Sequence, residues 1–247
     1  MSRWLLLAVG LGAYALGLII TAPATLIDAS LQQSSEGRLR LAEASGTLWS
    51  GTGQIEIRDA NRRAGIAKDI SWRLLPLYLL RGELRCEVGL DRAAKRFPLK
   101  VTLARIEITD ADVSLPAAAL GLGVPKLAPL ELSGELLLHA ARLSFAAGAI
   151  KGNATLQWRG AGSAFTQVSP LGDYEVRLEG EGATVRASLS TLEGPLRLAG
   201  QGSWTKGGNP VFQGTAGVPK EHLQQLAPLL RMIAIERSEG SFELQLR

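Results

Sequence analysis

The residue types that could do chemistry are few in this chain and stand apart from one another. Its 247 residues include one cysteine, Cys86, and two histidines, His139 and His222. A serine or thiol nucleophile needs a base beside it, and a hydrolase serine sits on a tight turn between a strand and a helix. Ser163, in the glycine-rich stretch "GAGSAF", lacks that setting, and neither histidine belongs to a recognisable motif. We therefore predict no catalytic residue and no enzymatic activity.

The remaining reactive side chains favour structural roles. Asp110 and Asp112 are two residues apart and would share a strand face, and "ITDADVSL" is typical of a solvated strand end. Cys86 falls on the apolar side of an expected strand, where a buried, inert thiol is the usual case. A single cysteine excludes an intrachain disulfide and a four-cysteine zinc site. We predict no metal site, no cofactor-binding residue and no cofactor.

Composition and charge narrow the class of protein. The chain is 46% hydrophobic and 20% charged, with 28 glycines and only 5% aromatic residues, which indicates a folded, turn-rich β protein. The formal net charge is +4, and no run of five like charges occurs. Nucleic-acid binding normally needs a clustered basic patch with aromatic residues, so we predict no nucleic-acid partner.

The N-terminal residues indicate a membrane segment. No charge occurs from Trp4 to Ile27, and "WLLLAVGLGAYALGLII" (4–20) lacks a polar face. As a helix this run would be about 25 Å long, enough to span a bilayer with its flanks. Ala22-Pro23-Ala24 would alternatively suit cleavage of a signal peptide, but the long apolar run favours a retained anchor. We predict a transmembrane anchor over residues 1–24 and a periplasmic β domain over residues 25–247. Arg3 ahead of the span predicts a single-pass protein with a cytoplasmic N-terminus.

Apolar and polar residues alternate through most of the chain. The clearest runs are 83–90, 153–158, 174–178, 183–189, 196–204 and 242–246. Strands that bury one face are typical of antiparallel sheets. The alternation predicts a mainly β fold with a large curved antiparallel sheet, open or partly closed in the manner of a taco or barrel. The apolar phase slips in "PLKVTLARIEI", which predicts a bulge or a bend near Ala104 or Arg105.

Two further stretches favour short helices. "LPAAALGLG" from Leu115 suits one or two turns, and "PKEHLQQLAPLLRMIAIE" from Pro219 suits a helix that closes one end of the sheet. In "SGTLWSGTGQIEI" (45–57) the glycines permit a sharp turn or a close backbone approach. Trp49 is then expected to be an inward anchor of the first strand, with an exposed recognition residue as the alternative.

A set of motifs follows in a fixed order along the chain. "GTLWSG" starts at Gly46, and Trp72, Leu74, Pro76, Leu79 and Gly82 form a Trp-x-Leu-x-Pro-x-x-Leu-x-x-Gly pattern. "LPAAAL" at Leu115, "PLGDY" at Pro170, "GPLRLAG" at Gly194 and a closing "GSFEL" complete the set. In order and spacing these motifs resemble the type II secretion system protein N family, also called general secretion pathway protein N, over nearly the whole chain.

The resemblance implies an accessory component of the inner membrane that is not an enzyme. Such a component supports export of folded periplasmic proteins across the outer membrane of Gram-negative bacteria through contacts with other secretion subunits. No catalytic or ligand residues come with the family. The alternative is a membrane-anchored, lipid-binding or lipid-transfer β groove similar to AsmA and TamB proteins. In that case the apolar lining would be Leu84, Val88, Leu156, Trp158, Val176 and Leu198.

Overall fold

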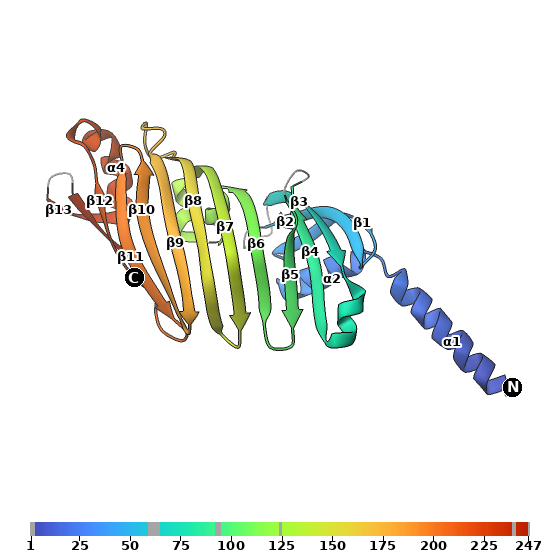
Figure 1. Ribbon diagram of the computed structural model, residues 1–247. Coiled ribbons are helices and arrows are strands. Elements are labelled where there is room, and N and C mark those ends of the chain that lie inside the picture. Colours follow the sequence, from blue (N-terminus) through green and yellow to red (C-terminus); the bar gives the residue numbers. More distant parts are fainter. Residues whose placement is uncertain (1–2, 59–64, 92–94, 124, 239–240, 247) are drawn as a thin grey trace. The chain divides into compact units, whose positions relative to one another are not determined.

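The computed structural model describes residues 3–58, 65–91, 95–123, 125–238 and 241–246. The chain divides into two compact units, unit 1 (Met1–Arg96) and unit 2 (Phe97–Arg247). The described residues form fourteen strands and a few mostly short helices (Figure 1). Strand pairing is antiparallel within each unit. The predicted mainly β class with antiparallel pairing is confirmed.

Unit 1 is a four-stranded meander preceded by two helices. The helices are α1 (Arg3–Ile20) and α2 (Thr25–Ser34), and the strands are β1 (Leu39–Gly46), β2 (Ser50–Ile57), β3 (Ile66–Leu74) and β4 (Glu83–Leu90). The short 3-10 helix η1 (Pro76–Arg81) joins β3 to β4. The strand order β1-β2-β3-β4 places each strand beside the next in the chain. Gly82 ends η1 with a φ of 71°, a left-handed conformation that glycine adopts without steric cost.

The apolar N-terminal run forms α1, but the membrane span predicted for residues 1–24 is not found. Helix α1 has 18 residues and ends at Ile20. At a rise of ~1.5 Å per residue it is about 27 Å long, less than the ~30 Å of a hydrocarbon core. Among the described residues, no helix combines the length and apolarity that a membrane crossing requires.

Two glycines in "SGTLWSGTGQIEI" make room for side chains from neighbouring strands. The Trp72 ring is only 6% exposed and lies across β2 at Gly51, where an added Cβ would be 2.4 Å from Trp72 Cζ2. Leu41 lies in the same way over Gly53, with its Cδ1 2.9 Å from such a Cβ. The Trp72 ring N–H points at the carbonyls of Thr47 and Leu48, each 3.2 Å away. The close backbone approach expected of these glycines is therefore present.

Trp49 is not the inward anchor predicted for the first strand. It lies half-buried in the turn between β1 and β2. Its ring N–H donates to the carbonyl of Ile19 at the end of α1 (2.8 Å). Because the residue lies outside a strand, the alternation of the neighbouring residues does not decide where its side chain points.

Unit 2 is a meander in which the last two strands exchange places. Its strands are β5 (Phe97–Thr102), β6 (Ile106–Pro116), β7 (Leu132–Ala146), β8 (Ala149–Ser163), β9 (Gly172–Gly182), β10 (Thr184–Glu193), β11 (Arg197–Thr205), β12 (Val211–Gly217), β13 (Ala234–Ser238) and β14 (Ser241–Leu246). Its helices are α3 (Ala119–Gly123), η2 (Pro125–Leu130), η3 (Lys220–His222) and α4 (Leu223–Ile233). The order runs from β5 to β12 and ends β12-β14-β13 (Figure 1). Since this order does not return to its first strand, the sheet is open.

The two faces of this sheet differ in polarity. In the β8–β9 register the apolar pairs are Trp158–Tyr174, Leu156–Val176 and Ala154–Leu178. The intervening pairs, Gln157–Glu175 and Thr155–Arg177, are polar. Residues paired in register lie on the same face of a sheet, and successive residues lie on opposite faces. The predicted alternation of one polar and one apolar face is confirmed, although Glu175 on the polar face is itself buried.

The core of unit 2 lies on the apolar face beneath α4. Leu226 and Leu230 of α4 are 0% exposed and pack in one cluster with Tyr174 and Phe242. The Tyr174 hydroxyl lies within hydrogen-bonding distance of the carbonyls of Leu171 (3.2 Å) and Leu196 (3.0 Å). The helix predicted from Pro219 is confirmed over η3 and α4, but the last residues of the predicted stretch, Ala234–Glu236, belong to β13. The helix predicted from Leu115 begins only at Ala119, because β6 continues to Pro116.

The phase slip after Phe97 marks a hairpin turn with a bend at Leu103 and Ala104, so of the bulge or bend predicted near Ala104 or Arg105 the bend is confirmed. Strand β5 ends at Thr102, whose N–H donates to the carbonyl of Arg105 (2.8 Å). The backbone irregularity lies further on, at Asp110, which has a φ of 51°. A turn and a bulge both shift the apolar phase by one residue, so the alternation does not distinguish them.

Candidate functional site

The structure gives Ser163 and Cys86 environments that suit structural roles. Ser163 is buried at the end of β8, and its hydroxyl donates to the carbonyl of Leu130 (2.6 Å). Cys86 is buried on β4, and this burial raises the pKa of its thiol. A hydroxyl committed to a carbonyl and a thiol kept protonated are both weak nucleophiles.

Asp112 and His139 are brought together on the polar face of unit 2. They lie opposite each other on β6 and β7, with His139 Nδ1 2.6 Å from Asp112 Oδ1. Their side chains are 52% exposed for His139 and 60% for Asp112, so water surrounds the pair. An exposed pair of this kind contributes ~0–1 kcal/mol and orients the imidazole. Sequence reasoning missed it because the residues are 27 positions apart and only the strand register joins them.

The second histidine has a different environment. His222 lies in η3, and its Nδ1 atom is buried without a hydrogen-bond partner among the described residues. No group of three or more histidine, cysteine, aspartate or glutamate side chains that could hold a metal ion occurs in the part of the chain that the structure describes.

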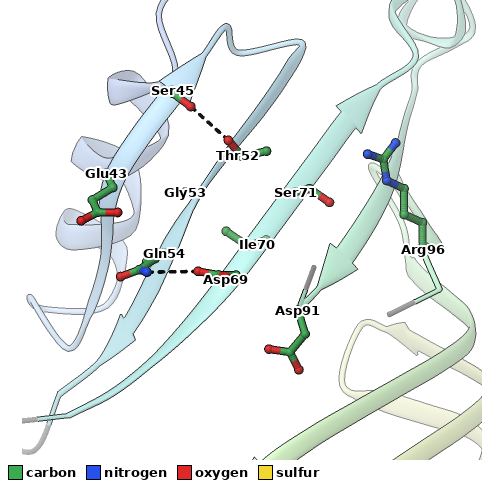
Figure 2. Close-up of a pocket in the computed structure, with 10 residues that line it drawn as sticks. All are labelled: Glu43, Ser45, Thr52, Gly53, Gln54, Asp69, Ile70, Ser71, Asp91 and Arg96. Atoms are coloured by element: carbon green, nitrogen blue, oxygen red, sulfur yellow. Dashed lines mark hydrogen bonds between the residues drawn. The ribbon is translucent and has the colours of Figure 1, made fainter. Parts of the chain in front are cut away.

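A polar hollow of about 530 Å³ lies on unit 1 (Figure 2). Its lining residues are Glu43, Ser45, Thr52, Gly53, Gln54, Asp69, Ile70, Ser71, Asp91 and Arg96. Two hydrogen bonds cross its floor, between the hydroxyls of Ser45 and Thr52 (3.0 Å) and from Gln54 Nε2 to Asp69 Oδ1 (3.1 Å). Glu43 stands at one side of the hollow and Arg96 at the other (Figure 2).

The hollow is suited to holding a polar group and not to nucleophilic chemistry. No histidine or cysteine lines it, so its hydroxyls have no neutral base beside them. Of its carboxylates, Asp69 accepts from Gln54, and Asp91 is ion-paired with Lys68. The stem of Arg96 fits over Gly89, where an added Cβ would be 3.1 Å from Arg96 Cγ.

The outer edge of β1 is covered by the segment that precedes it. The Leu41 N–H donates to Asp28 Oδ1 in α2 (2.8 Å), and the Leu39 N–H donates to Ser35 Oγ (2.9 Å). The Ala24 N–H donates to the carbonyl of Gly46 (3.3 Å). Occupied edge groups are unavailable to another strand, so this end of the sheet is blocked.

Asp28 remains ionised in this position. Burial raises the pKa of its carboxyl, but the hydrogen bonds from Gln32 and Leu41 and the charges of Arg40 and Arg58 outweigh burial and hold that pKa below its usual value. The Leu41 N–H therefore donates to a charged acceptor, which makes a stronger hydrogen bond than a neutral one.

The outer edge of β13 has different neighbours from the edge of β1. Within the described residues β13 pairs with β14 and with no other strand, and no turn, loop or cap backbone hydrogen bond reaches it. An edge strand presents unpaired backbone N–H and C=O groups, which are a template for another strand. The two ends of the strand order thus differ: the preceding segment covers the edge of β1, whereas β13 is the last strand of the order and has one strand neighbour among the described residues.

The residues predicted to line a lipid groove are divided between the two units. Leu84 and Val88 lie on β4 of unit 1, and the other four lie on β8, β9 and β11 of unit 2. Trp158 and Leu198 pack against the core cluster that includes α4. The part of the apolar face nearest α4 is therefore filled by the protein's own side chains.

Comparisons with known proteins agree over both units. A family model described as "Type II secretion system (T2SS), protein N" matches residues 37–245, from just before β1 into β14. A type II secretion system protein N from Klebsiella pneumoniae is 28% identical over 234 residues, which cover 88% of this chain and 84% of that protein. No solved structure gives a significant match.

Proposed function

The chain belongs to the type II secretion system protein N family, and we propose that it is a non-enzymatic accessory component that supports export of folded periplasmic proteins across the outer membrane. The family match over residues 37–245 carries this proposal. The environments of Ser163, Cys86 and the exposed Asp112–His139 pair agree with a role without chemistry.

We propose that the chain binds another secretion subunit by strand addition at β13. The place of β13 at the end of the described strand order supports this position, because the edge of β1 at the other end is already covered. An added strand that matches the five residues of β13 makes backbone hydrogen bonds worth a net ~0.5–1.5 kcal/mol each. Ordering the partner offsets much of that gain, so the pairing is weak by itself and is strengthened when both chains are confined to one compartment.

The location that we propose is the cell envelope. In the predicted arrangement the chain is held at the inner membrane with a cytoplasmic N-terminus, and residues 25–247 are periplasmic. Arg3 and the apolar side chains of α1 support this arrangement. Reporter fusions to the two termini test it, because an enzyme that is active only in the periplasm must be active at the C-terminus and inactive at the N-terminus.

The lipid-groove function is not favoured. The family to which the chain belongs is a secretion family. In addition, Trp158 and Leu198, two of the six groove residues, pack into the core of unit 2.

Site-specific crosslinking in living cells tests the strand-addition proposal. A photoreactive residue replaces Glu236 in β13, and the matched control carries it at Arg40 in the covered strand β1. We expect an adduct with another secretion subunit from position 236 and none from position 40. Equal adducts from both positions, or adducts from position 40 alone, would contradict the proposed edge.

A pair of proline variants tests whether backbone pairing is involved. Successive N–H groups of a strand point to opposite sides, so one of Ile235→Pro and Glu236→Pro removes an outward donor and the other removes a donor facing β14. We expect one variant to lose secretion with unchanged thermal stability. If both variants secrete exoproteins normally, or if deleting the gene leaves secretion intact, the proposal is wrong.

A further inference from the structure

Unit 1 exposes an apolar element in addition to α1. The sequence of η1 is "PLYLLR", and Leu77 and Leu80 are 78% and 88% exposed. Single exposed leucines are ordinary on protein surfaces. Two that project from one six-residue element are a patch, and patches of this kind mark contacts with proteins or membranes.

This element and the C-terminal end of α1 lie at the same end of unit 1. The turn between β1 and β2 is bonded to α1 and its continuation, through the Trp49 ring N–H to the Ile19 carbonyl (2.8 Å) and the Leu48 N–H to the Ala22 carbonyl (2.8 Å). The same turn accepts a bond from the chain that enters η1, from the Leu74 N–H to the Trp49 carbonyl (2.6 Å). Three hydrogen bonds therefore link the β1–β2 turn to the end of α1 on one side and to the residue that ends β3, just before η1, on the other.

Helix α1 limits the surface that this end meets to lipid or protein. Its exposed large apolar side chains are distributed all round the helix, at Trp4, Leu7, Val9, Leu11, Tyr14, Leu18, Ile19 and Ile20. A helix that is apolar on every side is covered by lipid or by protein and does not stay in water. An apolar patch that is linked to the end of such a helix through the β1–β2 turn meets the same environment.

The polar side chains in and beside η1 are of the kinds found at a lipid–water interface. The guanidinium of Arg85 lies over the Tyr78 ring, 4.0 Å from its centre. Arg85 also donates to Glu83 Oε2 through Nε (3.1 Å) and Nη2 (2.9 Å). Arg81 is exposed at the end of the helix. Tyrosine and arginine have an apolar body and a polar tip, and both are favoured where hydrocarbon meets headgroups.

We propose that η1 inserts Leu77 and Leu80 into the surface of a phospholipid bilayer, beside the C-terminal end of α1. Arg81 and the Tyr78–Arg85 pair then lie at the level of the headgroups. Two contacts, α1 and η1, restrict how unit 1 rotates on the membrane, whereas a single helix would leave it free to turn. This contact is independent of strand pairing at β13.

Fluorescence depth measurements on the full chain test the contact. The protein is reconstituted into protein-free vesicles of phosphatidylethanolamine and phosphatidylglycerol, with an environment-sensitive fluorophore on Leu80→Cys. The matched control carries the fluorophore on Gln33→Cys, an exposed position of α2 at the opposite end of β1 from the β1–β2 turn. The native Cys86 is buried and stays unlabelled in the folded protein.

The two positions have opposite expected results. The fluorophore at position 80 is quenched by nitroxide-labelled lipid and is protected from iodide in the buffer. The fluorophore at position 33 is quenched by iodide and not by the lipid. Iodide quenching at position 80 equal to that at position 33 would overturn the proposal.

A charged variant separates lipid insertion from other causes of shielding. Leu77→Asp is expected to abolish lipid quenching at position 80 without changing thermal stability, because the Leu77 side chain makes little contact with the protein. Leu192→Asp, at another exposed leucine, leaves the signal unchanged. Persistence of lipid quenching in Leu77→Asp would contradict the proposal. So would shielding in native membranes that is absent from vesicles, because it would identify a protein as the occupant.

Discussion

Removing the carboxylate of Asp28 tests how the β1 edge is kept closed. In Asp28→Ala the Leu41 N–H loses its acceptor in α2 while the β1–β2 register stays in place. Asp28→Asn is the conservative variant, because its amide oxygen still accepts but carries no charge. Gln33→Ala, an exposed position of the same helix, is the control.

The size of the effect follows from the kind of bond that is lost. A hydrogen bond to a charged group contributes about 1.5–3 kcal/mol. Since 1.36 kcal/mol corresponds to a tenfold change, the Leu41 amide of Asp28→Ala should exchange with solvent about 10- to 150-fold faster at neutral pH. Asp28→Asn should retain part of the protection, and Gln33→Ala should exchange like the wild type.

The pH dependence gives a second measurement. The folded pKa of Asp28 lies below its usual value of 3.8, so its contribution to stability is present above pH 3.8 and is lost as pH falls through the folded pKa. The difference between the wild type and Asp28→Ala should therefore shrink in acid. Residue-resolved hydrogen exchange at neutral and acid pH measures both effects. Unchanged Leu41 exchange in Asp28→Ala, or a difference that is the same at both pH values, would refute the reasoning.

Three further changes test the packing of each unit. Leu226→Ala empties a fully buried position and should lower the free energy of urea unfolding by ~2–5 kcal/mol. The control, Leu192→Ala at an exposed position, should change that free energy by less than about 0.5 kcal/mol. Similar losses in the two variants would contradict the assigned core. Tyr174→Phe should cost ~1 kcal/mol at neutral pH. Burial raises the pKa of Tyr174, with a smaller contribution from the charge of Asp173. The free energy of unfolding of the wild type should therefore fall as pH rises above 10.0, and that of Tyr174→Phe should not show this fall. Parallel profiles of unfolding free energy against pH would contradict this. Gly51→Ala forces Trp72 to move and should destabilise unit 1 by ~1–3 kcal/mol with a shift in tryptophan fluorescence, and wild-type stability would count against the close approach.

Local periodicity was sufficient to predict the strands that bury one face. The runs at 153–158 and 174–178 fall within β8 and β9, and all but the first residue of the run at 183–189 lies in β10, because alternation of apolar and polar residues directly reflects the two faces of the sheet. The helix from Pro219 was recognisable for the same reason, since Leu226 and Leu230 are four residues apart and both point into the core.

The errors arose where long-range contacts or turns decide the structure. The side chain of Trp49 is directed by a bond to Ile19, 30 residues away, which no local pattern records. Helix α2 was not predicted, because its residues were placed at the start of the β domain and no helix was expected there.

The candidate sites could not be predicted from the sequence for a related reason. Asp28 covers an edge strand 13 residues later, and the Asp112–His139 pair exists only through the β6–β7 register. Whether β13 lies at the edge depends on the exchange of β13 and β14, which is a property of strand order and not of composition.

That exchange has a consequence for the order of folding. From β5 to β12 the strands occur in the sheet in their order along the chain, so the hairpins close short loops at little entropic cost. The β12–β14 pairing instead closes a loop that contains η3, α4 and β13, and β13 becomes the outermost strand only after the C-terminal hairpin has docked. A partner that pairs with β13 would therefore bind only chains that have completed folding. Incompletely folded chains would not be bound, and no further component would be needed to exclude them.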